Sequence, residues 1–268
     1  MITIGYTENI ISQYIAKQFN LGISDSNLKF IDNCFFENLL ISYGVLRGSF
    51  EKIKQSKNFF YVDHGYFSKM KRVFFTDNKT GNKISSLPAP GSKNFDNSYF
   101  RVCYNSFFHS GLTENFNEDR FSKLNITIKK KRNKGEKILL IPPDPIIAQK
   151  IHGIINWETN TKSILTKYTD REIVTSSKHD KKKANDYFNE TFAVVTCYSN
   201  AGIEAMLNGI PCIFTHKDRK NFDLSLIEQI EFNEQILYNL AHYQWNIKEI
   251  QSGEAWESMK KIWLKDII

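Results

Sequence analysis

The chain has 268 residues, 41% hydrophobic and 14% aromatic, which is enough to bury a core and excludes a disordered protein. Its 36 Lys and Arg outnumber 29 Asp and Glu, and the net charge of +7 suits nucleotide phosphates, nucleic acid or an anionic glycan. Four cysteines without CxxC spacing argue against a disulfide framework or a zinc site, and no apolar run is long enough to span a membrane. We therefore expect a soluble, cytoplasmic protein.

Strand and helix patterns alternate over the first part of the chain. The expected strands are 2–4, 39–43 and 59–63. Helical spacing runs over 10–19 and again up to Ile53, and this alternation favours a parallel sheet. From 71 to 108 the pattern is irregular, and its Gly and Pro residues predict a long functional or mobile loop.

A polar, basic stretch at 128–135 interrupts this rhythm, and we interpret it as the connection between two domains, 1–128 and 135–240. The elements expected next are a strand (137–141), a turn (142–145), two helices (146–155 and 157–168), a strand (172–174) and a basic helix (181–188). The final stretch, 226–268, carries apolar residues spaced for one buried helical face and is expected to be helical.

The most informative segment runs from Phe192 to Phe214. It opens with a short, β-branched run, as expected of a buried parallel strand. The run Ser199-Asn200-Ala201-Gly202 supplies an N-cap and small residues, so a helix can begin with its backbone N–H groups facing outward. Asn208-Gly209 ends this helix, and Pro211 opens a second strand. A polar turn at the carboxyl end of a parallel strand is where open α/β sheets bind nucleotides, although any βαβ unit needs a similar turn.

This segment resembles the donor-binding unit of GT-B glycosyltransferases, in which a small-residue turn is followed by Glu-Ala, Gly-X-Pro and a strand. The chain is most similar to small phage-type and capsule-type nucleotide-sugar transferases, which carry motifs like those at 61–67, 169–173 and 244–256. The resemblance covers most of the chain. It implies an α/β fold of two Rossmann-like domains facing a cleft (GT-B), with C-terminal helices at 241–268 crossing back to pack on the first domain.

The resemblance also implies roles for residues of the second domain. Ser199, Asn200 and Ala201 would contact the diphosphate of a nucleotide sugar, which we expect to be UDP-linked, and Glu204 would hold the ribose. Related enzymes place an Arg or Lys against the leaving group. Lys178 is the nearest candidate here, although the lysine run around it is equally typical of a solvated helix face.

Asp63-His64-Gly65 follows a predicted strand, at the end that faces the cleft in such folds. Glycosyl transfer to a hydroxyl needs a base that takes the acceptor proton. We favour Asp63 as this base, with His64 contacting the acceptor or a phosphate; the alternative is that Asp63 caps a turn and His64 has a structural role. The sequence has no Asp-X-Asp pair at a strand end and no HExxH motif, which disfavours a metal-dependent mechanism.

Three further residues follow the long loop and are candidates for binding the acceptor: Arg101, Tyr104 and Asn105. The Arg101 guanidinium can pair with an acidic acceptor group or a donor phosphate, although a surface arginine is the plainer interpretation. In the second domain, Pro143 ends the first strand and is expected to lie near the nucleotide base.

We therefore expect a metal-independent glycosyltransferase with a nucleotide sugar as co-substrate and no bound cofactor. The acceptor is predicted to be a hydroxymethylated base in phage DNA, flipped out of the duplex and held through the basic run 129–134, with the host cytoplasm as its location. A surface glycan as acceptor, a non-catalytic nucleotide- or nucleic-acid-binding protein, and a sugar-nucleotide epimerase are the alternatives.

Overall fold

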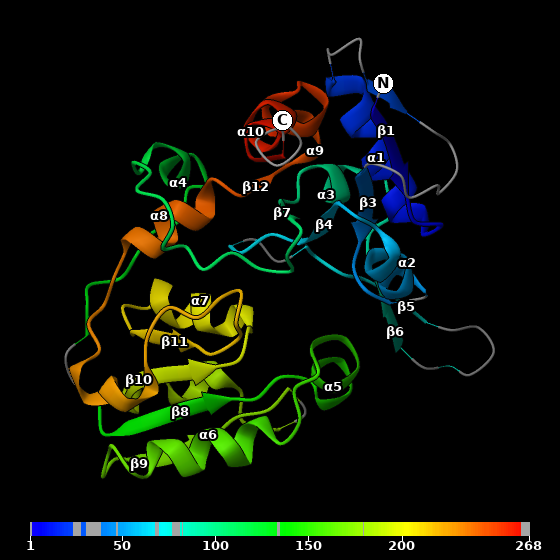
Figure 1. Cartoon of the computed structure of the whole chain (residues 1–268). Helices are drawn as coiled ribbons and strands as arrows, with labels where there is room; N and C mark the ends of the chain where they lie inside the picture. Colours follow the sequence, from blue (N-terminus) through cyan, green and yellow to red (C-terminus); the bar gives the residue numbers. More distant parts are fainter. Residues whose placement is uncertain are drawn as a thin grey trace. The chain divides into compact units, whose positions relative to one another are not determined.

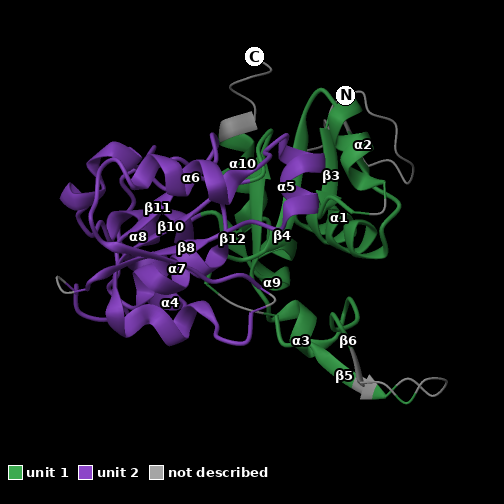
Figure 2. Cartoon of the chain, turned by 90° about the horizontal axis from the view of Figure 1, so that it is seen from below, with its two compact units in different colours: residues 1–107, 243–268 green, residues 108–242 purple. Residues whose placement is uncertain are grey.

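The computed structural model describes residues 2–23, 28–30, 39–46, 48–67, 70–76, 81, 83–132, 135–178 and 180–263. The chain divides into two compact units (Figure 2): unit 1 comprises Met1–Phe107 and Tyr243–Ile268, and unit 2 comprises Phe108–His242. The stretch 128–135, expected to connect two domains, lies inside unit 2. There the backbone N–H groups of Lys129 and Arg132 donate to the carbonyl groups of Leu207 and Gly209.

Unit 1 is built on a mixed six-stranded sheet in the order β12-β7-β4-β3-β1-β2 (Figure 1). Its strands are β1 (Ile2–Tyr6), β2 (Leu28–Phe30), β3 (Leu39–Tyr43), β4 (Phe59–His64), β7 (Phe100–Tyr104) and β12 (Gln244–Trp245). β1 to β4 pair in parallel, whereas β7 is antiparallel to both β4 and β12. The strands expected at 2–4, 39–43 and 59–63 are confirmed.

The helices of unit 1 bury apolar faces against this sheet. They are α1 (Ile10–Gly22), α2 (Ser49–Gln55), α3 (Lys93–Asp96), α9 (Ile247–Gln251) and α10 (Glu254–Trp263). Asn9 caps α1, since its side chain accepts from the Ile11 N–H. Phe19 of α1 shares one core with Trp245 and Trp256 from the last part of the chain. The N- and C-terminal segments of unit 1 are therefore packed together by apolar contacts.

Two sequence predictions for unit 1 are wrong. The loop expected at 71–108 contains a hairpin of β5 (Val73–Thr76) and β6 (Lys83–Ser86), then α3 and β7. The charged side chain of Arg101 interrupts the apolar pattern of β7 and hides the strand. The stretch expected to be helical after 226 contains β12, because Gln244 and Trp245 pair with Arg101 and Phe100 of β7.

Unit 2 contains a parallel four-stranded sheet in the order β11-β10-β8-β9. The strands are β8 (Lys137–Ile141), β9 (Glu172–Thr175), β10 (Thr191–Thr196) and β11 (Cys212–Phe214). The helices are α4 (Asp119–Lys123), α5 (Pro145–His152), α6 (Trp157–Leu165), α7 (Asn200–Leu207) and α8 (Gln235–Ala241), with 3-10 turns η1 (Ala184–Glu190) and η2 (Leu224–Gln229). α6 covers one face of the sheet and α7 the other (Figure 1). Together the mixed and parallel sheets confirm the α/β class.

The basic helix expected at 181–188 is confirmed only in part, because the helical residues form a 3-10 helix that begins at Ala184. Before it, Lys183 folds back so that its ammonium group donates to the carbonyl groups of Lys178 and Asp180. This lysine is exposed, and it closes a loop before the 3-10 helix.

None of the helices in the described ranges is both long enough and apolar enough to cross a membrane. Three of the four cysteines are buried free thiols, Cys103, Cys197 and Cys212. Cys34 lies outside the described residues.

Candidate functional site

The sheet of unit 2 changes its direction of winding between β8 and β10. From β8 the chain crosses to β9 on one side, then returns past β8 to β10 and β11 on the other side. At such a switch point the connections leave the carboxyl ends of neighbouring strands in opposite directions, which opens a crevice that binds ligands in α/β proteins. Pro143 follows β8 at this point, and Tyr198 and Ser199 follow β10.

Two helices begin beside the switch point. Ser199 caps α7, with its hydroxyl oxygen accepting from the Ala201 N–H at 3.2 Å. Asp144 caps α5 by accepting from the N–H groups of Ile146 and Ile147 at 3.0 and 3.1 Å. A helix amino end carries a partial positive charge and N–H groups without intrahelical partners, so this edge of the sheet favours an anionic ligand.

The small residues at the start of α7 have a steric cause. A Cβ atom on Gly202 would lie 2.6 Å from the Cys212 sulfur and 2.8 Å from a ring carbon of Phe214. Only glycine therefore lets α7 approach β11 this closely. The small residues at the start of α7 are therefore explained in part by this packing, and not by ligand binding alone.

The structure brings some of the predicted donor residues together. Ser199, Asn200 and Ala201 form the turn and the first residues of α7, and Glu204, which is partly exposed, lies one helical turn further along. Lys178 is exposed in the loop after β9. Because β8 separates β9 from β10, Lys178 follows a strand that is not adjacent to β10.

A cluster of four rings that the sequence did not predict surrounds the turn. Phe108 stacks on Tyr198 with ring centroids 5.0 Å apart, and His152 and His216 lie 4.9 and 5.8 Å from Tyr198. His152 ends α5, and His216 follows β11. We call these four residues the ring cluster. They come from four separate segments, so no local sequence pattern could have grouped them.

The two imidazoles of the ring cluster touch and are uncharged near neutral pH. His216 Nδ1 accepts from the Asp218 N–H at 3.2 Å, which leaves the proton on Nε2, directed at His152 Nδ1 at 3.1 Å. Burial, together with the smaller effect of the neighbouring His216, lowers the pKa of His152 to about 4. Burial also lowers the pKa of His216.

In unit 1, Asp63 lies at the carboxyl end of β4 with three hydrogen-bond donors around its carboxylate. Oδ2 accepts from the Tyr61 hydroxyl at 2.7 Å and from Arg101 at 2.8 Å, and Oδ1 accepts from the His64 backbone N–H at 2.8 Å. Burial opposes the ionisation of Asp63, but the Arg101 guanidinium, His64 and the Tyr61 hydroxyl outweigh it, and the pKa of this carboxyl lies below its usual value. Asp63 is therefore an ionised carboxylate that is fixed in place by its three hydrogen-bond donors.

The pleat of β4 separates Asp63 from His64. Tyr61 shares a face with Asp63, whereas His64 lies on the other face, where its ring packs edge-on against Tyr43 at 6.1 Å between centroids. Burial lowers the pKa of His64, although Asp63 opposes this shift. The two candidate catalytic residues are neighbours in sequence but have separate environments.

The three predicted acceptor residues are not brought together. Arg101 is opposite Asp63, whereas Tyr104 is opposite Phe60, three residues away along β7 and thus about 10 Å distant. Tyr104 donates to the Asn58 side chain at 3.0 Å, and Asn105 accepts from the Phe59 N–H at 2.8 Å. These two residues close the amino end of β4 and have structural partners there.

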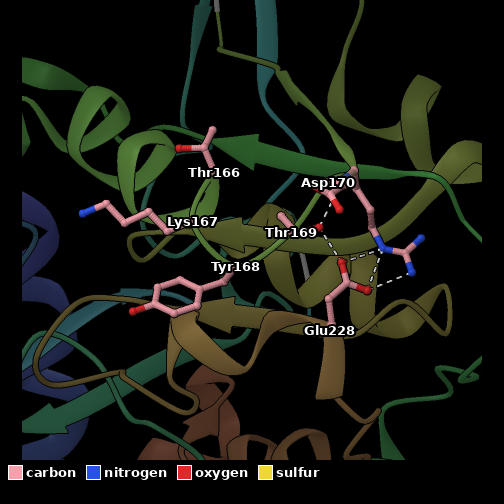
Figure 3. Close-up of a pocket in the computed structure, with 7 residues that line it drawn as sticks. Thr166, Lys167, Tyr168, Thr169, Asp170 and Glu228 are labelled. Carbon is pink, nitrogen blue, oxygen red and sulfur yellow. Dashed lines mark hydrogen bonds and ion pairs between the residues drawn. The ribbon is translucent and has the colours of Figure 1, made fainter.

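A cavity of about 590 Å³ lies at the opposite, amino edge of the unit 2 sheet, just before β9 (Figure 3). Arg171 donates to both carboxylate oxygens of Glu228, at 3.0 and 2.9 Å, and Thr169 also donates to Glu228. Arg171 further donates to the Gly135 carbonyl at 2.6 Å. These groups satisfy one another, so the motif at 169–173 holds the loop before β9 in place.

Among the described residues, no group of three or more His, Cys, Asp or Glu side chains is placed to hold a metal ion.

Comparison with known proteins finds a likeness among solved structures. No protein-family model matches the sequence, and no curated protein matches it. Among solved structures, the chain is similar to KpsC of Thermosulfurimonas dismutans, described as a β-Kdo 2,7 transferase, with a TM-score of 0.52 and 12% identity. The match covers 95% of this chain and 99% of that one. The protein therefore has a glycosyltransferase-like α/β fold.

Proposed function

We propose that the protein is a glycosyltransferase of the GT-B type, which moves a sugar from a nucleotide-sugar donor to a hydroxyl acceptor. The observation that carries the proposal is the polar turn at Ser199, which begins α7 at the switch point of unit 2. Parallel α/β sheets bind nucleotides at such points, and a helix amino end attracts phosphate. The fold similarity to KpsC, a sugar transferase, supports the same reaction class.

In this proposal unit 2 binds the donor without a metal ion. The amino end of α7, at Asn200 and Ala201, lies against the diphosphate, and Glu204 accepts hydrogen bonds from the ribose hydroxyls. Pro143, across the switch point, contacts the base, and Lys178 adds a cation from beyond β8. The resemblance to GT-B enzymes suggests these roles, and the position of the turn at the carboxyl edge of the sheet supports them.

Unit 1 supplies the base in this proposal. The acceptor oxygen forms its bond to the anomeric carbon of the sugar, and the bond from that carbon to the diphosphate oxygen breaks. The nucleoside diphosphate leaves with the bonding electrons, and the acceptor proton passes to Asp63. Arg101 keeps Asp63 ionised before the transfer, so the carboxylate is ready to accept that proton.

A glycan hydroxyl is the acceptor we propose. The predicted DNA acceptor relied on the basic run 129–134, but Arg132 donates to the carbonyl groups of Phe188 and Asn189 at 2.9 and 2.7 Å. Residues 133–134 lie outside the described part of the chain. KpsC is described as a β-Kdo 2,7 transferase, and this sugar transfer favours a carbohydrate acceptor.

The test is a screen of UDP-, GDP-, ADP- and CMP-sugars for thermal stabilisation, followed by mass spectrometry with glycan acceptors and with hydroxymethylated DNA. A bound donor raises the melting temperature more as its concentration rises, because ligand that binds only the folded state stabilises it by mass action. We expect one donor to stabilise the protein and its sugar to appear on a glycan. Sugar on DNA would show that DNA, and not a glycan, is the acceptor. If no donor stabilises the protein, the proposed transferase function is contradicted in favour of a non-catalytic binding protein.

A further inference from the structure

Arg219 is fully buried, with 0% of the residue exposed, directly behind the turn that begins α7. It follows β11, where its backbone N–H donates to the His216 carbonyl at 2.8 Å and closes a turn. In the sequence it belongs to the run Lys217-Asp218-Arg219-Lys220, and four successive charges are typical of a solvated loop. Only the structure shows that the third of them points inward.

The guanidinium of Arg219 contacts both sides of the N-cap residue. It donates to the Tyr198 carbonyl at 2.7 Å, and the same nitrogen lies 3.4 Å from the Asn200 side-chain oxygen. Its planar group lies 4.1 Å from the ring centroid of Phe214 and 5.8 Å from that of Phe108. Arg219 therefore fixes the residue before Ser199 and the residue after it.

The order of strands favours Arg219 over Lys178 as the cation that serves the turn. Arg219 follows β11, which is directly hydrogen-bonded to β10, whereas Lys178 follows β9, on the far side of β8. Arg219 is enclosed by aromatic rings, and Lys178 is exposed to solvent. Water and salt screen an exposed charge strongly and a buried charge much less. The buried guanidinium therefore contributes more to the potential at the amino end of α7.

We propose that Arg219 is a positioning residue for the donor phosphate: it holds Tyr198 and Asn200 so that the amino end of α7 presents its N–H groups, and it adds a fixed positive charge behind them. This inference rests on the proposed function, since it concerns the same donor site. The charge is permanent, because a guanidinium stays protonated at any pH at which the protein folds. The imidazoles of the ring cluster beside it are uncharged near neutral pH.

The experiment compares Arg219→Gln and Arg219→Lys with a matched control, Arg120→Gln. Arg120 is also buried in unit 2, with 7% of the residue exposed, and it also donates to a backbone carbonyl, that of Ala241 at 3.1 Å. It belongs to α4, away from the switch point of the sheet. Both glutamine variants remove a buried guanidinium, so both are expected to lower the melting temperature.

The decisive readout is calorimetric binding of UDP, GDP, ADP and CMP, each compared with its phosphate-free nucleoside. For the nucleotide that binds best, we expect Arg219→Gln to lose at least tenfold in affinity while binding of the nucleoside changes less than twofold. Arg120→Gln should bind both as the wild type does. Arg219→Lys keeps the charge but has a shorter side chain without the planar group that packs against Phe214, so we expect a loss of at least threefold.

The possible results distinguish a failure of the Arg219 inference from a failure of the proposed function. If Arg219→Gln does not fold, Arg219→Lys carries the test by the same nucleotide-to-nucleoside comparison. If the Arg219 variants lose nucleotide and nucleoside binding equally, the residue supports the fold alone and the inference is overturned. Wild-type affinity in both Arg219 variants overturns it as well and leaves the proposed function standing. If the wild type binds none of the four nucleotides, the proposed donor site itself has failed.

Discussion

Arg101 in unit 1 and Arg219 in unit 2 are both almost completely buried, with 6% and 0% of the residue exposed, and they differ in what accepts their hydrogen bonds. Arg101 donates to the carboxylate of Asp63, so the two charges neutralise each other. Arg219 donates to the Tyr198 carbonyl and approaches the Asn200 side chain, which are neutral oxygens. The first arginine sets the state of a carboxylate, and the second holds the residues on either side of the N-cap of α7.

This difference matches the division of labour in the proposed reaction. A group that accepts a proton must be ionised beforehand and held in place, and Asp63 has three donors that do so. A site for a departing diphosphate needs positive potential that water does not screen. If the comparison holds, changes around Asp63 alter turnover, and changes around α7 alter donor affinity.

The largest effect is expected from Asp63→Asn. An amide cannot take the acceptor proton, so turnover should fall by roughly 10²- to 10⁴-fold while donor affinity is retained. Single-turnover kinetics and calorimetry on the same preparation measure the two quantities. Asp96→Asn is the control, because Asp96 belongs to α3 of the same unit, and not to β4, and accepts from the Tyr14 hydroxyl. Near-normal turnover in Asp63→Asn would remove Asp63 from the mechanism.

Arg101→Met should lower the free energy of unfolding. Breaking a fully buried ion pair costs about 3–5 kcal/mol, and because Asp63 keeps 25% of its side chain exposed we expect roughly 2–3 kcal/mol. Urea unfolding at neutral pH measures it. Lys54→Met removes an exposed pair with Glu51 and should cost less than about 0.5 kcal/mol.

The same variant makes a prediction about pH. The folded-state pKa of Asp63 is lowered, so its contribution to stability is present above the unfolded value, about 3.9, and is lost as the pH falls through the folded value. The difference in stability between wild type and Arg101→Met should therefore shrink below pH 4. A difference that is constant down to pH 2 would show that the ion pair is not its source.

Glu204→Ala tests the second region. Loss of a charge-assisted hydrogen bond to ribose should weaken nucleotide binding by about 1–3 kcal/mol and leave the catalytic step unchanged. Comparing a ribonucleotide with its 2′-deoxy form in both proteins assigns the loss to the ribose. The matched control is Glu158→Ala, because Glu158 lies on α6, on the other face of the sheet, and accepts from Thr175. Unchanged affinity in Glu204→Ala would end the ribose assignment.

The smallest effect concerns the two imidazoles of the ring cluster. The folded-state pKa of His152 is lowered to about 4, so below about pH 6.5 the unfolded chain binds a proton that the folded protein does not. Stability therefore falls as the pH drops from 6.5 toward 4, by roughly 1–2 kcal/mol after allowing for the partial exposure of His152. His152→Gln keeps a hydrogen-bond acceptor for His216, and its melting temperature should fall less over this range. Equal falls in both proteins would contradict the lowered pKa.

Local signals in the sequence determined much of the architecture. The apolar runs at 137–141 and 192–197 predicted β8 and β10, because strands buried on both faces are nearly all apolar. Ser199 predicted the start of α7, because a hydroxyl oxygen can accept from an N–H group that has no partner within the helix. Each of these signals depends on residues a few positions apart, so the strands and the helix start can be predicted without knowing the tertiary structure.

What only the tertiary structure decided depends on pairs far apart in the chain. Asp63 meets Arg101 because β4 and β7 run antiparallel, and the same register places Tyr104 at the other end of the strands. Arg219 reaches Tyr198 because β11 lies beside β10 and because aromatic rings can enclose a guanidinium that its sequence context marks as solvated. Whether a charged side chain faces water or the interior is settled by the partners that the fold brings to it. The sequence therefore identified the turn at Ser199, and the fold supplied the arginine behind it.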